Sequence, residues 1–397
     1  MKKILYLAAA AAMMVSCMET EKIGNDLQEA NEQNVIGFAS YSEKATRGNV
    51  NTNTNLEYYH NTFAVYGTKK NKNNANDIQY VFGGKAEAAG AQDGVTCTYQ
   101  DPTDAVLGDW KYTDPRIWDK QADYNFIAYA PALAGNPIRY YYNAANAEVG
   151  DAGNWFKTSS DYILAGTNLQ ATATQAEKTK GFNAADTDLD LMISGSEAKD
   201  GANHGEYVGL SFKHILSKLN VTITQDETLY NSVVTINEVK ITGFKDKGSY
   251  DQAIYNAAAN PKVSGWTADV EDDTYKLIYN KQGGQVLDKG QYVDNDDNNT
   301  TPDVFQAGDP YFFIESLVMP QTIVDDQITL TINYTIKTGN YSEDYPYQLD
   351  LYDVVALQKF YDGYNYYLNF TLSTEPIKFD ASVSTWDNQA GVAKTIE

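Results

Sequence analysis

The amino-acid sequence predicts an all-β protein made of two β-sandwich domains in tandem. Many short segments alternate between apolar and polar residues with a period of two, the pattern of a strand that turns one face to a core. Tyrosine dominates the aromatic residues, with 31 Tyr against 14 Phe and 5 Trp, which suits strands whose side chains lie partly in water. The 397 residues suffice for two or three domains of ordinary size, and we expect two.

The charge balance argues against two classes of partner. The chain has 30 Lys and Arg against 53 Asp and Glu, which gives a formal net charge of -23. Such a surface repels nucleic acid and anionic membrane surfaces. We therefore expect a secreted protein with a soluble, self-repelling exterior that does not bind nucleic acid.

The first residues have the order of a secretory signal peptide. Lys2 and Lys3 precede an apolar core from Ile4 to Val15, and Ser16 and Cys17 follow. A cysteine directly after a small residue at the end of such a core is the pattern of bacterial lipoproteins, in which the thiol is acylated. We therefore predict a lipoprotein signal peptide over residues 1–17, lipidation of Cys17, and a precursor held on a membrane by its acyl chains.

The alternative is a plain signal peptide with an incidental cysteine, because Met14 stands where the lipoprotein pattern prefers leucine. The only other cysteine is Cys97, between two threonines, and we expect it to be a small core residue of a strand. No intrachain disulfide framework is therefore expected once Cys17 is acylated.

Residues 18–47 are predicted to form a prosegment with a removable first strand. Up to Gln33 they are polar and acidic, with too little apolar surface to fold. A strand pattern follows, in which Ile36, Phe38 and Ser40 share one face, and this face is expected to lie on a core.

The step from Arg47 to Gly48 is the candidate processing site. Arginine occurs only at positions 47, 116 and 139, and Arg47 lies in a polar loop of small residues directly after the strand pattern. A protease that cuts there would release a core strand, and a sandwich that can lose a strand can accept another one. The alternative is an ordinary first strand followed by an ordinary loop.

Further strands are expected along the whole chain. In the first half they are Phe63–Gly67 within the stretch Tyr58–Thr68, then Ile78–Phe82, Val95–Tyr99, Tyr124–Tyr129, Asp161–Ala165, Leu189–Ile193 and Tyr207–Phe212. In the second half they are Leu219–Thr224, Val233–Phe244, Tyr275–Tyr279, Asp309–Val318, Gln327–Lys337, Tyr364–Leu372 and Ile377–Val383. The aromatic run from Trp110 to Tyr129 is interpreted as the core of the first domain, and an exposed sugar platform is the alternative. A one-turn crossing at Lys213–Ser217 is expected to join the two domains.

Sequence motifs for catalysis or cofactor binding are missing. His60, His204 and His214 lie far apart and lack metal-ligand spacing, and His214 is expected to be structural. The acidic loop 294–299 could wrap calcium, but it lacks the glycine and the terminal glutamate of an EF-hand, so we interpret it as solvated. We expect no enzyme activity, no metal and no cofactor.

The assembled pattern resembles the fimbrillin family, the lipoprotein-exported pilus subunits of anaerobic Gram-negative bacteria, over nearly the whole chain. Its carriers, in order, are Ser16-Cys17, Ala45-Thr46-Arg47, Trp118 with Tyr124–Pro131, Leu210–Leu219, Tyr366–Phe370 and Ile377–Trp386. The resemblance implies two transthyretin-like β-sandwich domains, over residues 48–213 and 214–397. It also implies a prosegment removed by an arginine-specific protease, and donor-strand exchange into an adhesive surface fimbrium. The precursor would be an outer-membrane lipoprotein, and its partners would be copies of itself or related pilin subunits.

The C-terminal stretch is the expected donor. The residues that would carry this role are Ile377, Phe379, Ala381, Val383, Trp386, Val392 and Ile396. We expect the strand from Ile377 to Val383 to pair within its own domain and the segment after it to be donated. A surface glycan-binding lipoprotein is the alternative function, since it would share the lipid signal, the sandwiches and the tyrosine content without needing a cleavage site.

Overall fold

The computed structural model describes the chain in sixteen ranges: 35–42, 62–83, 94–100, 109–132, 138–142, 154–158, 162–163, 190–195, 197–203, 206–245, 247–252, 264–269, 276–293, 304–354, 357–374 and 377–385. Within these ranges the chain forms β-strands and short 3-10 turns and no α-helix, which confirms the predicted all-β class. None of the described segments is a helix long and apolar enough to cross a membrane.

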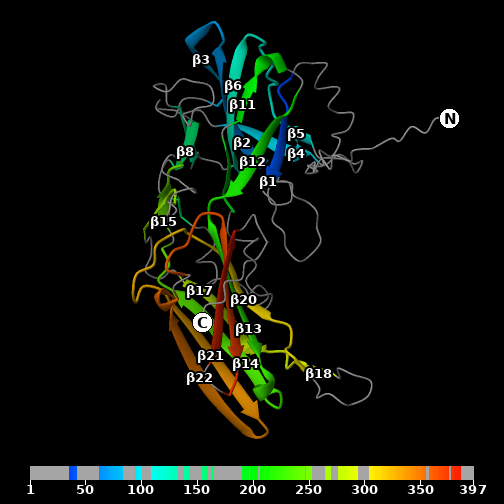
Figure 1. The fold of residues 1–397 in the computed structure, drawn as a ribbon, viewed down its shortest axis with the longest axis vertical. Helices are drawn as coiled ribbons and strands as arrows, with labels where there is room; N and C mark the ends of the chain where they lie inside the picture. Colours follow the sequence, from blue (N-terminus) through cyan, green and yellow to red (C-terminus); the bar gives the residue numbers. More distant parts are fainter. Residues whose placement is uncertain are drawn as a thin grey trace, which may run out of the picture.

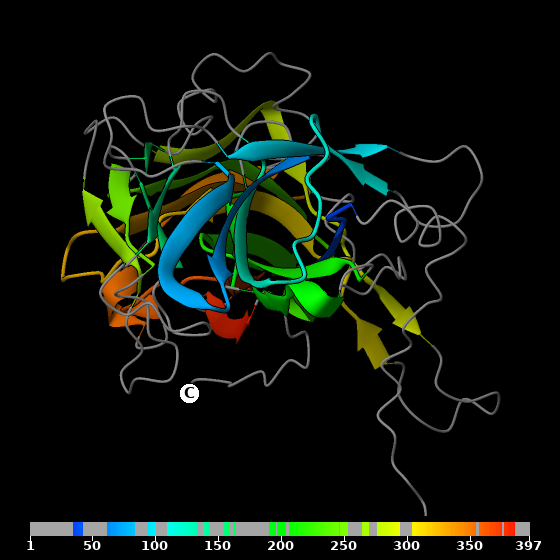
Figure 2. The same ribbon diagram turned by 90° about the horizontal axis from the view of Figure 1, so that it is seen from above.

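The first half of the chain forms one nine-stranded sheet. Its order is β1-β12-β10-β6-β2-β4-β5, with β11 also paired to β6 and β3 to β2. The strands are β1 (Phe38–Ser42), β2 (Thr62–Asn71), β3 (Asn74–Phe82), β4 (Val95–Gln100), β5 (Asp109–Lys111), β6 (Ala122–Ala130), β10 (Met192–Ser194), β11 (Glu197–Asp200) and β12 (Val208–His214). Seen along the long axis of the molecule, these strands curve strongly (Figure 2). The sheet therefore wraps around its own apolar face.

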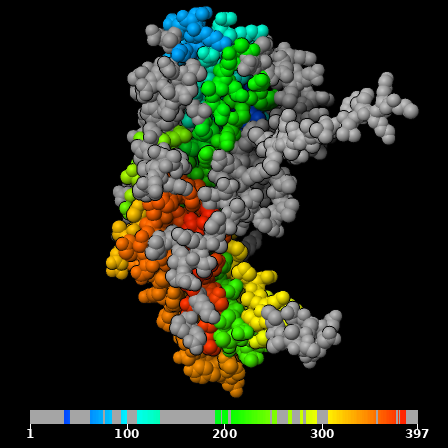
Figure 3. All heavy atoms as spheres, in the orientation of Figure 1, coloured from blue at the N-terminus to red at the C-terminus, as the bar shows by residue number. Residues whose placement is uncertain are grey.

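The second half forms a sandwich of two four-stranded sheets, of order β20-β13-β23-β24 and β17-β14-β21-β22. The strands are β13 (Ser217–Gln225), β14 (Val233–Thr242), β17 (Lys276–Val286), β20 (Tyr311–Val318), β21 (Thr329–Thr338), β22 (Tyr341–Asp350), β23 (Tyr364–Leu372) and β24 (Lys378–Thr385). Two 3-10 turns, η5 (Glu227–Leu229) and η6 (Leu351–Asp353), are capped by the side chains of Asp226 and Asp350. The nine-stranded sheet and the sandwich follow one another along the long axis, so the molecule is elongated (Figures 1 and 3).

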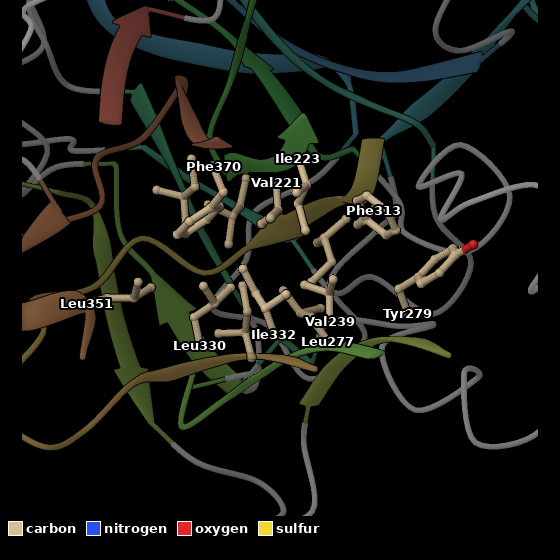
Figure 4. Packing of buried hydrophobic residues seen from close by; sticks show 14 of the residues in the cluster. Val221, Ile223, Val239, Leu277, Tyr279, Phe313, Leu330, Ile332, Leu351 and Phe370 are labelled. Carbon is tan, nitrogen blue, oxygen red and sulfur yellow. The ribbon is translucent and has the colours of Figure 1, made fainter. Parts of the chain in front are cut away.

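The core of the sandwich comes from alternate residues of both sheets. Val221 and Phe370 reach in from one sheet and face Leu330 and Ile332 of the other (Figure 4). All four are at most 1% exposed. Strict alternation in β21 and β23 therefore produced the buried face that the sequence indicated.

A third apolar cluster joins the two halves. Only Ile215 and Leu216 separate β12 from β13, and both are buried. They pack with Tyr66 and Tyr129 on the outer face of the nine-stranded sheet and with Trp266. Trp266 belongs to a small sheet of β16 (Trp266–Asp269), β15 (Lys247–Tyr250) and β9 (Tyr162–Ile163). The halves are thus linked by a packed junction.

A buried carboxylate fastens the loop before β16 to the start of β23. Asp362 accepts hydrogen bonds from the hydroxyl of Ser264 and from the amide of Gly265 at 3.1 Å. Burial raises the pKa of the Asp362 carboxyl from the ordinary 3.8 to about 6, against the opposing effect of these hydrogen bonds. The folded state therefore binds this proton more tightly than the unfolded state does, so the stability contribution of Asp362 is complete below pH ~4 and is lost as pH rises through ~6.

Replacing Asp362 with Asn is expected to remove this loss, because the amide can still accept from Gly265 and can donate to Ser264. The difference in free energy of unfolding between variant and wild type should grow between pH ~4 and ~6, by on the order of 2–3 kcal/mol. Urea denaturation at several pH values measures it. A difference that stays constant with pH would contradict the assignment.

Several elements differ from the sequence prediction. The structure adds β22, and it adds the hairpins β7 (Ile138–Tyr142) with β8 (Asn154–Thr158) and β18 (Gln291–Val293) with β19 (Val304–Gln306). The expected crossing at Lys213–Ser217 is shorter, because β12 continues through His214 and β13 begins at Ser217. His214 is buried, with its Nδ1 2.8 Å from Oδ2 of Asp190, which fits a structural histidine.

Candidate functional site at strand β1

Strand β1 lies at one end of the nine-stranded sheet and pairs in parallel with β12. The register places Phe38 opposite Val208, Ala39 opposite Gly209 and Ser42 opposite Phe212. The amide of Val208 also donates to the carbonyl of Gly37 at 2.9 Å. About 170 residues separate the two strands in sequence (208 minus 38), so no local turn holds β1 in this place. Backbone pairing and side-chain burial therefore keep β1 in its position.

The inner face of β1 fills the core. Ile36 is 0% exposed, Phe38 2% and Ser40 7%, whereas the intervening residues are half-buried. The ring of Phe38 has four aromatic neighbours, with centroid distances of 5.3 Å to Phe82, 5.8 Å to Tyr112 and Phe126, and 6.1 Å to Phe63. All four are edge contacts, the favourable arrangement for aromatic pairs. Without β1 this aromatic cluster would lose Phe38, the residue that contacts all four of the others.

The start of β1 also meets the opposite end of the sheet. The hydroxyl of Tyr112, just after β5, donates to the carbonyl of Ile36 at 2.7 Å, and the amide of Ile36 donates to the carbonyl of Arg116 at 2.8 Å. Val35 forms a bridge with Ile117. Because β1 is bonded to β12 on one side and to the segment after β5 on the other, it closes the curved sheet.

Two further features follow from this position. The pKa of Tyr112 is raised to about 12, mainly because the hydroxyl is removed from water, so Tyr112 stays a neutral donor to Ile36 at physiological pH. Tyr112 and the carbonyl of Arg116 were not predicted as members of the site. Their role depends on the backbone path after β5, for which the sequence carries no signal beyond the aromatic character of Tyr112.

The predicted donor strand is paired at home. β24 is antiparallel to β23 from Lys378 to Thr385, and it forms an edge of its sheet. The ring of Phe379 stacks on Phe370 at 4.8 Å, and Ala381 is 2% exposed. Ile377 and Val383 are half-buried against the same core. This arrangement agrees with the expectation that the strand pairs within its own sandwich.

Six other predicted site residues fall outside the described ranges: Cys17, Arg47, Gly48, Trp386, Val392 and Ile396. The same holds for His60, His204 and the acidic loop 294–299, for which no site was predicted. Cys97 is described, and it is a free and buried core cysteine, as expected.

One group of carboxylates within the described ranges could hold a cation by geometry alone. Oxygen atoms of Asp325, Asp326 and Asp350 lie within 4.8 Å of one another. Asp350 already accepts hydrogen bonds from the amides of Asp326 at 2.7 Å and Tyr352 at 2.9 Å, so the group is explained by its role in fixing a turn.

A model of the fimbrillin-like family matches residues 44–386. No curated protein sequence matches the chain.

Among solved structures, a candidate cell adhesion protein from Bacteroides uniformis is 15% identical, with 89% of this chain and 98% of that one covered and a TM-score of 0.41. One from Bacteroides ovatus is 10% identical, with 89% and 97% covered and a TM-score of 0.41. A fimbrial assembly protein from Parabacteroides distasonis is 10% identical, with 88% and 98% covered and a TM-score of 0.31. These similarities are too low to assign a function. The family match, in contrast, spans most of the chain, and the protein therefore belongs to the fimbrillin-like family.

Proposed function

We propose that this protein is a structural, non-enzymatic subunit of a surface fimbrium that serves adhesion. In this proposal it is exported as an outer-membrane lipoprotein acylated on Cys17 and is cut between Arg47 and Gly48. It then polymerises with copies of itself or with related pilin subunits. Membership of the fimbrillin-like family supports the general role.

The observation that carries the maturation step is the position of β1. The strand closes the curved sheet and ends at Ser42, five residues before Arg47. A cut after Arg47 would therefore separate a core strand from the rest of the chain, residues 48–397. Loss of Ile36 and Phe38 would uncover an apolar groove with unpaired backbone groups on β12, and exposing such an edge is costly in water.

A strand from another subunit would restore both the backbone pairing and the apolar contacts. We propose that the C-terminal tail after Thr385 supplies it, while Ile377, Phe379, Ala381 and Val383 stay in the home sheet as part of β24. Each subunit would then offer a tail to one neighbour and a groove to the other. A head-to-tail contact of this kind builds an open fibre rather than a closed ring.

Replacing Arg47 with Ala is expected to abolish fibre formation and to trap the uncut precursor, because β1 stays covalently attached and occupies the groove. Electron microscopy of the cell surface measures assembly, and mass spectrometry of the trapped protein measures its start at Cys17 and the acyl chains on that residue. Lys44→Ala is the matched control, since it removes a positive charge from the same loop without removing the arginine, and it should assemble normally.

Normal fibres from the Arg47→Ala variant would overturn the proposal. A mature wild-type protein that begins at Cys17 would favour the glycan-binding alternative, which has no need of the cut.

A further inference from the structure

The ring of Tyr207 lies against the backbone of Gly37 on the outward side of β1. A Cβ atom added to Gly37 would be 2.9 Å from Cε1 of Tyr207 and 3.0 Å from Cδ1, closer than carbon atoms normally pack. The hydrogen bond from the amide of Val208 to the carbonyl of Gly37 fixes the two backbones relative to each other. Any strand that takes the place of β1 therefore meets this ring at the level of residue 37.

We propose that Tyr207 sets the register of the replacing strand, by admitting glycine at the level of Gly37, and that the strand it admits is Ala390–Lys394 of a second copy of this chain. The inference rests on the proposed function, since it specifies how the exchanged strand is seated. It assigns a specificity role to Tyr207, which the sequence pattern did not single out.

The chain carries the required pattern twice. Of its 28 glycines, only Gly37 and Gly391 are followed by a larger apolar residue and then by alanine, in Gly37-Phe38-Ala39 and Gly391-Val392-Ala393. With Gly391 at the level of Gly37, Ala390 takes the place of Ile36 and Val392 the place of Phe38. Ala390 and Val392 then enter the core together with Lys394 in the place of Ser40, and the small residues Gly391 and Ala393 lie on the outward face.

Strand β24 offers a rival match that Tyr207 disfavours. Ile377 and Phe379 have the same spacing as Ile36 and Phe38, but Lys378 would then stand in the place of Gly37. A lysine side chain there would have to displace the ring of Tyr207. Because β24 is also paired along β23, the tail is the better candidate on both counts.

The sequence after β24 contains enough residues for both a connection and an exchanged strand. Twelve residues follow Thr385, which is the end of β24. At about 3.3 Å per residue, twelve residues would span roughly 40 Å if fully extended. Ala390 to Lys394 are the fifth to ninth of these residues, which leaves four residues, 386–389, as a connection to the donor subunit.

Three positions fit less well than β1 itself, the first being Ala390, which is smaller than the fully buried Ile36 that it replaces. Val392 fills only part of the space of Phe38, and Lys394 stands in the place of Ser40, which is 7% exposed. The tail would therefore bind more weakly than the covalently attached β1 and would enter only after the cut. The register accordingly predicts that Val392→Phe and Lys394→Ser, which restore the residues of β1, strengthen the contact between subunits.

The register can be read by disulfide cross-linking in mature subunits. Tyr41 lies opposite Ser211, so the proposed register places Thr395 of the donor opposite Ser211 of the acceptor, whereas the rival register places Ser382 there. Ser211→Cys combined with Thr395→Cys is expected to give covalent ladders under oxidation, and Ser211→Cys combined with Ser382→Cys is expected to give none.

The role of Tyr207 has a readout that loss of folding would not mimic. Gly391→Leu should reduce ladder formation about tenfold or more, because the leucine meets the ring. Adding Tyr207→Ala to Gly391→Leu should restore ladders, since the smaller side chain makes room. A merely structural role for Tyr207 would make the double variant worse.

The outcomes separate the two proposals. Fibres with ladders through Ser382, or no rescue by Tyr207→Ala, overturn the register and leave strand exchange intact. Cut subunits that form neither fibres nor ladders with any cysteine pair overturn the proposed function, and the register with it.

Discussion

Replacing Phe38 with Ala in the uncut precursor is expected to lower the free energy of unfolding by about 3–5 kcal/mol, the usual cost of deleting a buried aromatic ring. The effect should lie at the upper part of this range, because four aromatic neighbours surround Phe38 and only one strand holds β1 along its length. Urea denaturation followed by tryptophan fluorescence measures it, since Trp110 and Trp118 belong to the same core cluster.

Ala39→Ser is the matched control for this experiment. Ala39 belongs to the same strand but lies on its outward face, so its change should shift stability by no more than about 0.5 kcal/mol. Equal effects at the two positions would show that β1 does not present a specific face to the core. The Phe38→Ala precursor should also become more sensitive to proteolysis than the wild type, because a weakened β1 spends more time detached.

Replacing Trp266 with Ala is expected to cost about 3–5 kcal/mol as well, for a different reason. The indole Nε1 donates to the carbonyl of Ile215 at 2.6 Å, and the ring packs at 5.2 Å from Tyr250. The substitution both empties a buried space and leaves a backbone carbonyl at the junction without its donor. Calorimetry should then resolve two unfolding transitions, one for each half of the molecule.

Trp266→Phe separates the two contributions. It keeps most of the ring and loses the donor, so we expect about 1–3 kcal/mol and a single transition. If Trp266→Ala unfolded in one step with wild-type stability, the halves would still be coupled, and Trp266 would not be the residue that couples them.

The sequence predicted the buried face of β1, because period-two alternation alone places Ile36 and Phe38 on one side. It could not predict that β1 pairs with β12 in parallel, since nothing local connects strands so far apart in the chain. The aromatic pocket around Phe38 is likewise assembled from separate strands. Each of its members was recognisable as a core residue, but the sequence did not indicate that they meet around Phe38.

Strand β22 was not predicted from the sequence, and the reason is physical. The first half of β22 is exposed and polar, and Pro346 stands near the middle of the strand. The apolar alternation that marks a strand is therefore weak. The structure places β22 at the edge of its sheet, where a proline costs no hydrogen bond to a neighbour and discourages further pairing. Strands are predicted from apolar alternation, which reflects the burial of one face. An edge strand that is largely exposed shows little of this alternation.

The short step from β12 to β13 has a mechanical consequence. Both strands run roughly along the long axis of the molecule, and only two residues separate them (Figure 1). Tension between the two ends therefore passes almost directly from one strand to the next. Within the sandwich, β13 lies between β20 and β23, with hydrogen bonds on both sides along its length. A pull along β13 loads these bonds side by side in shear, so that they resist together instead of opening one after another.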